Sequence, residues 1–120
     1  MNKSIAASPH YEDYVFETHN DTEIQVGGTC LQGYINAHYH DLLETFGEPT
    51  ESDGYKVDAE WALEFADGTV ATIYNWKNGI NYCGADGTPV ECITEWHIGG
   101  ISGTGIVDKV RAILENKDIE

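Results

Sequence analysis

Few side chains in this sequence have the types and spacing that chemistry requires. If residues 57–65 are extended, Glu60 and Glu64 point to one face of a strand. Glu95 and His97 follow on a later predicted strand. Paired carboxylates beside a histidine can act as general acid and base. We favour a solvent-exposed sheet face with alternating charge, because no Ser, Cys or Thr lies in a nucleophile motif. The sequence therefore predicts a protein that is not an enzyme.

The histidines are poorly spaced for a metal site. His38 and His40 are two residues apart, so on a helix their side chains point about 200° apart and cannot share an ion. His97 and Cys30 would have to complete a site with one of them, and nothing in the sequence brings them together. We expect no metal and no cofactor.

One glycine-rich segment has features of an anion site. It lies between a predicted strand and a predicted helix and contains Gly99, Gly100, Ser102, Gly103 and Thr104. Backbone N–H groups at a helix N-terminus attract phosphates. The segment lacks the lysine of a P-loop and the glycine spacing of a dinucleotide site, so a plain connection is the simpler interpretation. Sequestering of an anionic nucleotide signal here is the alternative function.

Charge is the most uneven property of the chain. There are 21 Asp and Glu against six Lys and Arg, a net charge of −15, and residues 1–68 hold 14 of the acids with only two bases. Such a field repels nucleic acid and anionic membrane and attracts basic proteins. Seven acidic residues close in sequence are the candidate protein-binding residues: Glu44, Glu48, Glu51, Asp53, Asp58, Glu60 and Glu64. The same carboxylates also serve solubility in many proteins.

Length and composition predict one domain. A chain of 120 residues, 41% hydrophobic, can bury a core. We expect a flexible N-terminal arm over residues 1–12 and a single domain over 13–120. There is no apolar run of about 18 residues and no secretory signal, so we expect a cytoplasmic protein. The odd number of cysteines argues against a disulfide framework and leaves open whether Cys83 and Cys92 pair.

Two helices are predicted. The first has Asn36 as its N-cap and Gly47 as its C-terminal cap, and its apolar positions follow a period of 3.6 residues: Ile35, Tyr39, Leu42, Leu43 and Phe46. The second begins near residues 102–104. Its apolar stripe is Ile106, Val107, Val110, Ile113 and Leu114.

A long hairpin is the strongest local signal. Residues 57–65 and 70–76 alternate between apolar and polar side chains, and Asp67-Gly68 between them predicts a two-residue type I′ turn. That turn sets Phe65 opposite Val70 and Trp61 opposite Tyr74, and it predicts that Val70, Thr72, Tyr74 and Trp76 are buried with Trp61.

The remaining segments predict short strands and loops. Residues 14–17, 22–26 and 94–98 are strand candidates, the last of them ended by Gly99-Gly100. Residues 78–92 are rich in glycine and predict a small hairpin about Asp86-Gly87. Antiparallel strands without parallel crossovers indicate an α+β fold, with a single antiparallel sheet of about four to five strands and two helices packed on one face.

Four short sequence blocks carry a resemblance to known proteins: LQGYI (31–35) with FGEP (46–49), then DAEW (58–61), DGTVATIYNWK (67–77) and WHIGG (96–100). Together they span about residues 29–114, and the chain resembles a widespread group of small, mostly uncharacterised proteins of tailed bacteriophages and prophages. The group has no established common activity.

Phage origin implies a class of function. Small acidic phage proteins often inhibit host defence, as anti-restriction or anti-CRISPR proteins that occupy a basic groove. The resemblance therefore implies an inhibitor in the host cytoplasm that binds a host protein with a basic groove, without direct contact to nucleic acid or membrane. The oligomeric state stays open between a monomer and a homo-oligomer.

Overall fold

The computed structural model describes residues 15–50, 57–76 and 79–116. Five strands form one antiparallel sheet in the order β1-β3-β4-β5-β2. The strands are β1 (Phe16–Thr18), β2 (Cys30–Asn36), β3 (Glu60–Phe65), β4 (Val70–Tyr74) and β5 (Glu95–Gly100); the two main helices are α1 (Tyr39–Phe46) and α3 (Ile106–Asn116). The predicted α+β architecture is confirmed. The expected arm over residues 1–12 lies outside the described residues.

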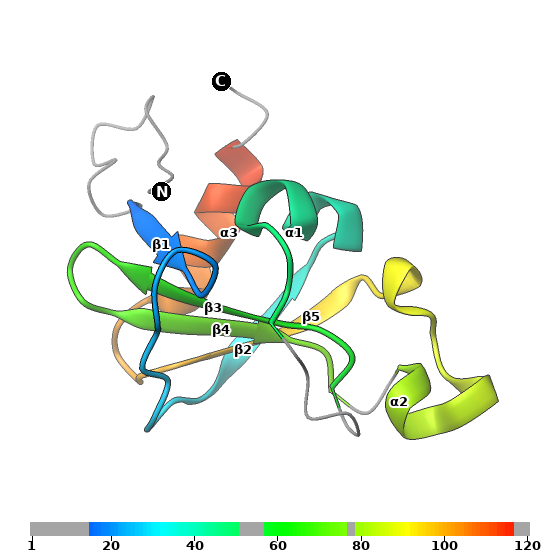
Figure 1. Cartoon of the computed structure of the whole chain (residues 1–120). Helices are drawn as coiled ribbons and strands as arrows, with labels where there is room; N and C mark the ends of the chain where they lie inside the picture. The colour runs from blue at the N-terminus through cyan, green and yellow to red at the C-terminus, as the bar shows by residue number, and fades with distance from the viewer. Residues whose placement is uncertain (1–14, 51–56, 77–78, 117–120) are drawn as a thin grey trace.

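The core lies between the sheet and the two helices, which cover the same face (Figure 1). The largest buried side chains come from both layers: Trp61, Leu63, Ile73, Trp96 and Ile98 from the sheet, with Leu42, Phe46, Ile106 and Val110 from the helices. Full burial of each such side chain contributes about 1.5–3 kcal/mol. We call the other face of the sheet the open face.

Helix α1 begins later than the sequence predicts. Asn36 is the last residue of β2, and the Ala37 N–H donates to the Thr94 carbonyl at 2.8 Å. The N-cap position falls to His38, which makes no side-chain capping bond. Pairing of β2 with β5 therefore overrides the capping preference of Asn36. The predicted end is correct, since Gly47 follows the helix with φ of +84°.

The hairpin register differs by one residue from the predicted one. Trp61 pairs with Ile73 and Leu63 pairs with Ala71. The loop has three residues, 66–68: the Gly68 N–H donates to the Phe65 carbonyl at 2.8 Å, and Gly68 has φ of +91°. This is a turn that ends in a left-handed glycine, instead of a two-residue type I′ turn.

The shift changes which side chains of β4 are buried. Because side chains alternate along a strand, a slip of one residue exchanges the two faces. Ala71 and Ile73 are completely buried with Trp61 on the helix side, whereas Val70, Thr72 and Tyr74 point to the open face. Of these three, Thr72 is buried as predicted, at 4% exposure, and the other two are half-buried. Trp76, predicted to be in the core, is 41% exposed.

Other connections also differ from the predictions. Residues 19–29 form no strand and instead cross the open face from β1 to β2 (Figure 1). Residues 79–92 hold a one-turn helix, α2 (Ile80–Cys83), and two 3₁₀ turns, without the hairpin expected at Asp86-Gly87. The cysteines Cys30, Cys83 and Cys92 are exposed free thiols. Helix α3 buries the predicted stripe, although it begins at Ile106.

Candidate functional site

Two acidic side chains oppose each other across β1 and β3. Glu17 is the partner of Glu64 in the sheet register, and its neighbours Phe16 and Thr18 are buried on the helix side, so Glu17 belongs to the open face. Glu60 lies four residues before Glu64 on the same face of β3. Side chains in opposite positions have Cβ atoms about 4.5–5.5 Å apart, and like charges there are destabilising. We call Glu17, Glu60 and Glu64 the acidic face.

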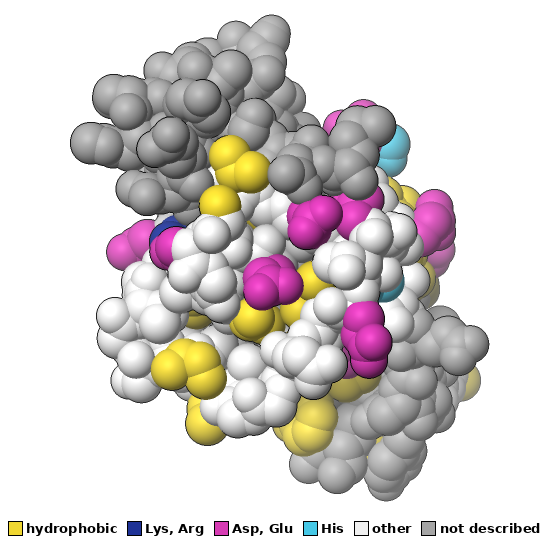
Figure 2. Space-filling view, turned by 60° about the vertical axis from the view of Figure 1, so that its left-hand side comes forward, with side chains coloured by type: hydrophobic (Ala, Val, Ile, Leu, Met, Phe, Trp, Pro, Cys, Tyr) yellow, Lys and Arg dark blue, Asp and Glu magenta, His cyan; other side chains and the backbone are white. Residues whose placement is uncertain are grey.

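Acidic side chains far outnumber basic ones among the described residues. These residues hold fifteen acidic and two basic side chains, a surplus of 13 negative charges. Both bases form ion pairs with acidic residues outside the acidic face. Lys109 Nζ lies 2.6 Å from Asp67 Oδ2, and Arg111 Nη1 lies 3.1 Å from Asp108 Oδ1. Figure 2 shows acidic side chains spread over the visible surface, with hydrophobic side chains exposed between them.

The structure separates the seven predicted protein-binding residues. Glu60 and Glu64 share the acidic face as expected. Glu48 is exposed. Two residues later, the Thr50 N–H donates to the Glu60 carbonyl at 2.7 Å, so the segment that contains Glu48 runs beside β3. Glu44 lies on α1, on the other side of the sheet, and its Oε2 is 3.2 Å from His40 Nε2. Glu51 and Asp53 lie outside the described residues.

Asp58 has a structural role. The side chain of Asn75 is completely buried, and its Oδ1 accepts the backbone N–H groups of Asp58 at 2.7 Å and Ala59 at 3.2 Å. Its Nδ2 in turn donates to Asp58 Oδ1 at 2.9 Å. The carboxylate of Asp58 therefore holds the start of β3 against the end of β4, because a buried amide needs such partners.

A row of rings lies beside the acidic face. Four residues are cross-strand partners in one row of the sheet: Glu60 on β3, Tyr74 on β4, His97 on β5 and Tyr34 on β2. The His97 ring centroid lies 4.8 Å from that of Tyr34 and 5.4 Å from that of Tyr74. With Trp76 and Leu31, these rings give the open face an apolar part next to a charged part. A hollow of about 310 Å³ lies among Leu31, Tyr74 and Trp76.

Burial and charge shift two pKa values in this row. Burial lowers the pKa of His97, against a smaller opposing effect of Glu95, and thereby favours the neutral imidazole. Burial raises the pKa of Tyr74, and the negative charge of Glu60 raises it further. Glu60 and His97 are separated by the whole of β4, roughly 9–10 Å from strand to strand. Tyr74 lies between them in the register, and its ring centroid is 5.4 Å from that of His97.

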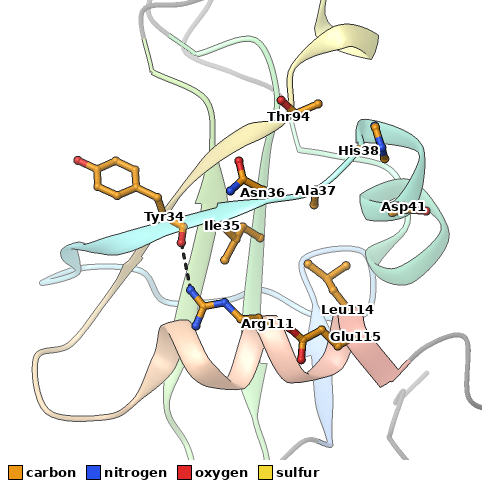
Figure 3. A pocket seen from close by; sticks show the side chains of 10 residues that line it. All are labelled: Tyr34, Ile35, Asn36, Ala37, His38, Asp41, Thr94, Arg111, Leu114 and Glu115. Atoms are coloured by element: carbon orange, nitrogen blue, oxygen red, sulfur yellow. Dashed lines mark hydrogen bonds between the residues drawn. The ribbon is translucent and has the colours of Figure 1, made fainter.

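A cavity of about 490 Å³ lies at the edge of the sheet (Figure 3). Its walls come from β2 (Tyr34, Asn36), from the start of α1 (His38, Asp41) and from α3 (Arg111, Leu114, Glu115). Arg111 extends from α3 toward β2, and its Nη2 donates to the Tyr34 carbonyl at 3.4 Å. No local sequence pattern predicts this cavity, because β2 and α3 come together only in the folded chain.

The predicted anion-binding residues have packing and turn contacts. Gly99 and Gly100 lie inside β5, not in the connection after it. A Cβ on Gly100 would lie 2.7 Å from Ile106 Cγ2, so close packing with α3 requires glycine there. The N–H and hydroxyl of Thr104 donate to the Ile101 carbonyl at 3.3 and 2.6 Å. Ser102 and Gly103 are exposed in this turn.

Glu17 was missed at the sequence level. Its position between Phe16 and Thr18 shows the two-residue alternation of a strand, but no local signal indicates that β1 pairs with β3. Within the described residues, no three His, Cys, Asp or Glu side chains are grouped to hold a metal ion. No helix among them has the length and apolar character to cross a membrane.

Comparison with known proteins gave no match: no family model, no curated protein and no solved structure is similar to this chain.

Proposed function

We propose that this protein is a non-enzymatic binding protein, and that its acidic face binds and covers a cationic surface of a partner protein. The observation that carries the proposal is the position of Glu17 directly opposite Glu64, with Glu60 on the same face. Such a pair costs folding stability. A cationic partner would remove this cost on binding, and it would be attracted from a distance by the net charge of the chain.

The rings beside the acidic face support the same function. Tyr34 and Trp76 are 49% and 41% exposed, and exposed aromatic side chains are typical of interface centres. Carboxylates next to them would supply the charged part of the contact. A partner surface of matching chemistry has Lys or Arg around an apolar centre.

The resemblance to phage proteins adds a class of partner. A host defence protein whose groove binds nucleic acid presents the required basic surface, and an acidic protein seated in that groove would block it. This part of the proposal depends on the resemblance alone.

Affinity capture from bacterial lysate, at low and at high salt, tests the proposal. The test variant is Glu17→Gln/Glu60→Gln/Glu64→Gln. The control, Glu44→Gln/Asp86→Asn/Glu91→Gln, removes the same charge from exposed sites off the open face. We expect a basic protein to bind wild type and control at low salt, to bind the test variant weakly, and to dissociate as salt rises. Equal binding by the two variants would contradict the role of the acidic face.

Nucleotide binding before α3 has less support. Gly99 and Gly100 are buried in β5, and the Thr104 N–H is bonded to the Ile101 carbonyl. A thermal-shift screen with nucleotides would reverse this preference if one nucleotide raised the Tm by several degrees and Ser102→Asp abolished the effect.

A further inference from the structure

We propose that the outer edge of β2, which pairs with no other strand among the described residues, is a second binding site. There an extended segment of a partner protein, carrying Lys or Arg, adds to the sheet as another strand. This inference does not depend on the proposed function, because it uses the main-chain groups at the edge of β2, whereas the proposed function uses side chains of the open face.

The direction of the main-chain groups of β2 supports the site. In an antiparallel pair, successive residues point their N–H and C=O groups alternately toward and away from the neighbouring strand. Ala37 donates toward β5, at the Thr94 carbonyl, so Tyr34, three residues earlier, and Asn36 point away from it. The contact of Arg111 with the Tyr34 carbonyl shows that this carbonyl faces the cavity. These are the groups that an added strand would bond.

The cavity provides room beside this edge. Its volume of about 490 Å³ lies along the same residues of β2, with Leu114 of α3 as an apolar wall (Figure 3). A strand added to a sheet lies about 4.8 Å from its neighbour. Its alternate side chains would therefore enter the groove between β2 and α3.

Charge selects the occupant. Asp41 and Glu115 both line the cavity, and Arg111 is its one basic side chain among the described residues. The Arg111 guanidinium is also bonded to Asp108 at 3.1 Å, which offsets its charge. A cationic side chain of the incoming segment would lie near the carboxylates of Asp41 and Glu115. A second copy of this chain is a poor occupant, because each copy has a net charge of −15.

Features of the edge limit its length. The pairing of β2 with β5 shifts between Leu31 and Gly33, which leaves a regular stretch from Gly33 to Asn36. Bulges and bonded cations near an edge prevent uncontrolled strand pairing. Arg111 must leave the Tyr34 carbonyl before a strand can bind, so Arg111→Met should strengthen binding of a cationic segment.

The experiment uses the full-length, ¹⁵N-labelled protein and a short blocked peptide of alternating valine and lysine. The matched control peptide has glutamate in place of lysine. We expect the lysine peptide to shift the N–H signals of Tyr34 and Asn36 and to slow their exchange with solvent. The N–H of Glu17, on the other edge strand, should not change. The glutamate peptide should bind much more weakly.

A pair of substitutions at one position tests the main-chain bond. Asn36→Pro removes the outward N–H at an edge position where proline is tolerated, whereas Asn36→Ala keeps it. We expect Asn36→Pro to weaken peptide binding roughly tenfold relative to Asn36→Ala. If Asn36→Pro does not fold, a peptide N-methylated at single positions tests the same bonds on wild-type protein. An alternating loss of affinity along the peptide is then expected.

Several outcomes would overturn the proposal. Peptide shifts confined to Tyr74 and Trp76 would place the peptide on the open face, which would support the proposed function and refute this site. Protection of Tyr34 and Asn36 that grows with protein concentration, without peptide, would identify a second copy as the occupant. No binding at millimolar peptide would refute the site, whatever the acidic-face variants show.

Discussion

Trp61 and Trp96 meet edge to face in the core, with ring centroids 5.6 Å apart, and between them they hold both ends of α1. The indole N–H of Trp61 donates to the Gly47 carbonyl at 2.8 Å, just after the helix. That of Trp96 donates to the Ala37 carbonyl at 3.0 Å, just before it. The two tryptophans lie on β3 and β5, the strands on either side of β4, and together they fix α1 on the sheet.

Trp96→Phe should lower the free energy of unfolding by about 1–3 kcal/mol, because it removes a buried hydrogen bond and part of a buried ring. Urea unfolding followed by circular dichroism measures the loss. Trp76→Phe is the control: it makes the same change at a side chain that is 41% exposed and should change stability by less than about 0.5 kcal/mol. Equal losses would mean that the bond to Ala37 contributes little.

The ion pair between Asp67 and Lys109 should make stability depend on pH in acid. Partial burial acts to raise the pKa of Asp67, but hydrogen bonds from Lys109 and Thr69, with the Lys109 charge, outweigh it and lower the pKa to about 2. A carboxylate with a lowered pKa stabilises the fold above its ordinary value of 3.8 and loses this effect as pH falls through the folded value. Wild type should therefore lose stability between about pH 4 and pH 2 more steeply than Asp67→Asn. Unfolding curves across that range measure the difference, and parallel curves would contradict it.

Gly68→Ala should destabilise the hairpin by about 1–2 kcal/mol, because Gly68 has φ of +91°, a left-handed conformation that is costly for other residues. Gly27→Ala is the matched control, since a Cβ there meets no atom within 4 Å and the backbone is not left-handed. Thermal unfolding of the two variants compares them directly. Similar Tm values would argue against a strict glycine requirement in the turn.

Gly100→Ala should destabilise the fold by about 1–3 kcal/mol through overpacking against Ile106. The exposed turn residue Ser102 provides the control, as Ser102→Ala should be nearly neutral. If Gly100→Ala left stability unchanged but altered nucleotide binding, these residues would have a ligand role and not a packing role.

Glu17→Lys should have opposite effects on stability and binding. Replacing one of two facing carboxylates by a cation should add about 0.2–1 kcal/mol of stability, because Glu64 then gains an oppositely charged neighbour. The same change should weaken capture of a cationic partner. Glu23→Lys, at an exposed loop position, controls for net charge. A stabilised variant with undiminished capture would show that the acidic face is not the binding surface.

The sequence was sufficient for the parts of the fold that local patterns determine. Local patterns predicted a strand over residues 94–98 and set Glu60 with Glu64 on one face, and Gly47 correctly ended α1. These features depend on the period of a strand or on the backbone freedom of one glycine.

The remaining features depend on contacts between distant segments. Asp67-Gly68 fits a two-residue turn and also the last two residues of a three-residue loop, and only packing against α3 favours Ala71 and Ile73 as the buried set. Asn36 has a strong capping preference, yet pairing with Glu95 keeps it in β2. For the same reason, no local pattern predicts that Glu17 is the partner of Glu64, or that a cavity lies between β2 and α3.

The one-residue shift of the hairpin register leaves Trp76 partly exposed, and the fluorescence of this residue can report on the open face. Trp61 and Trp96 are completely buried, whereas Trp76 is open to solvent. A small neutral quencher such as acrylamide should therefore reach the red-shifted emission of Trp76 and leave the emission of the other two indoles. Any molecule that covers the hollow among Leu31, Tyr74 and Trp76 would shield that fluorescence without a label.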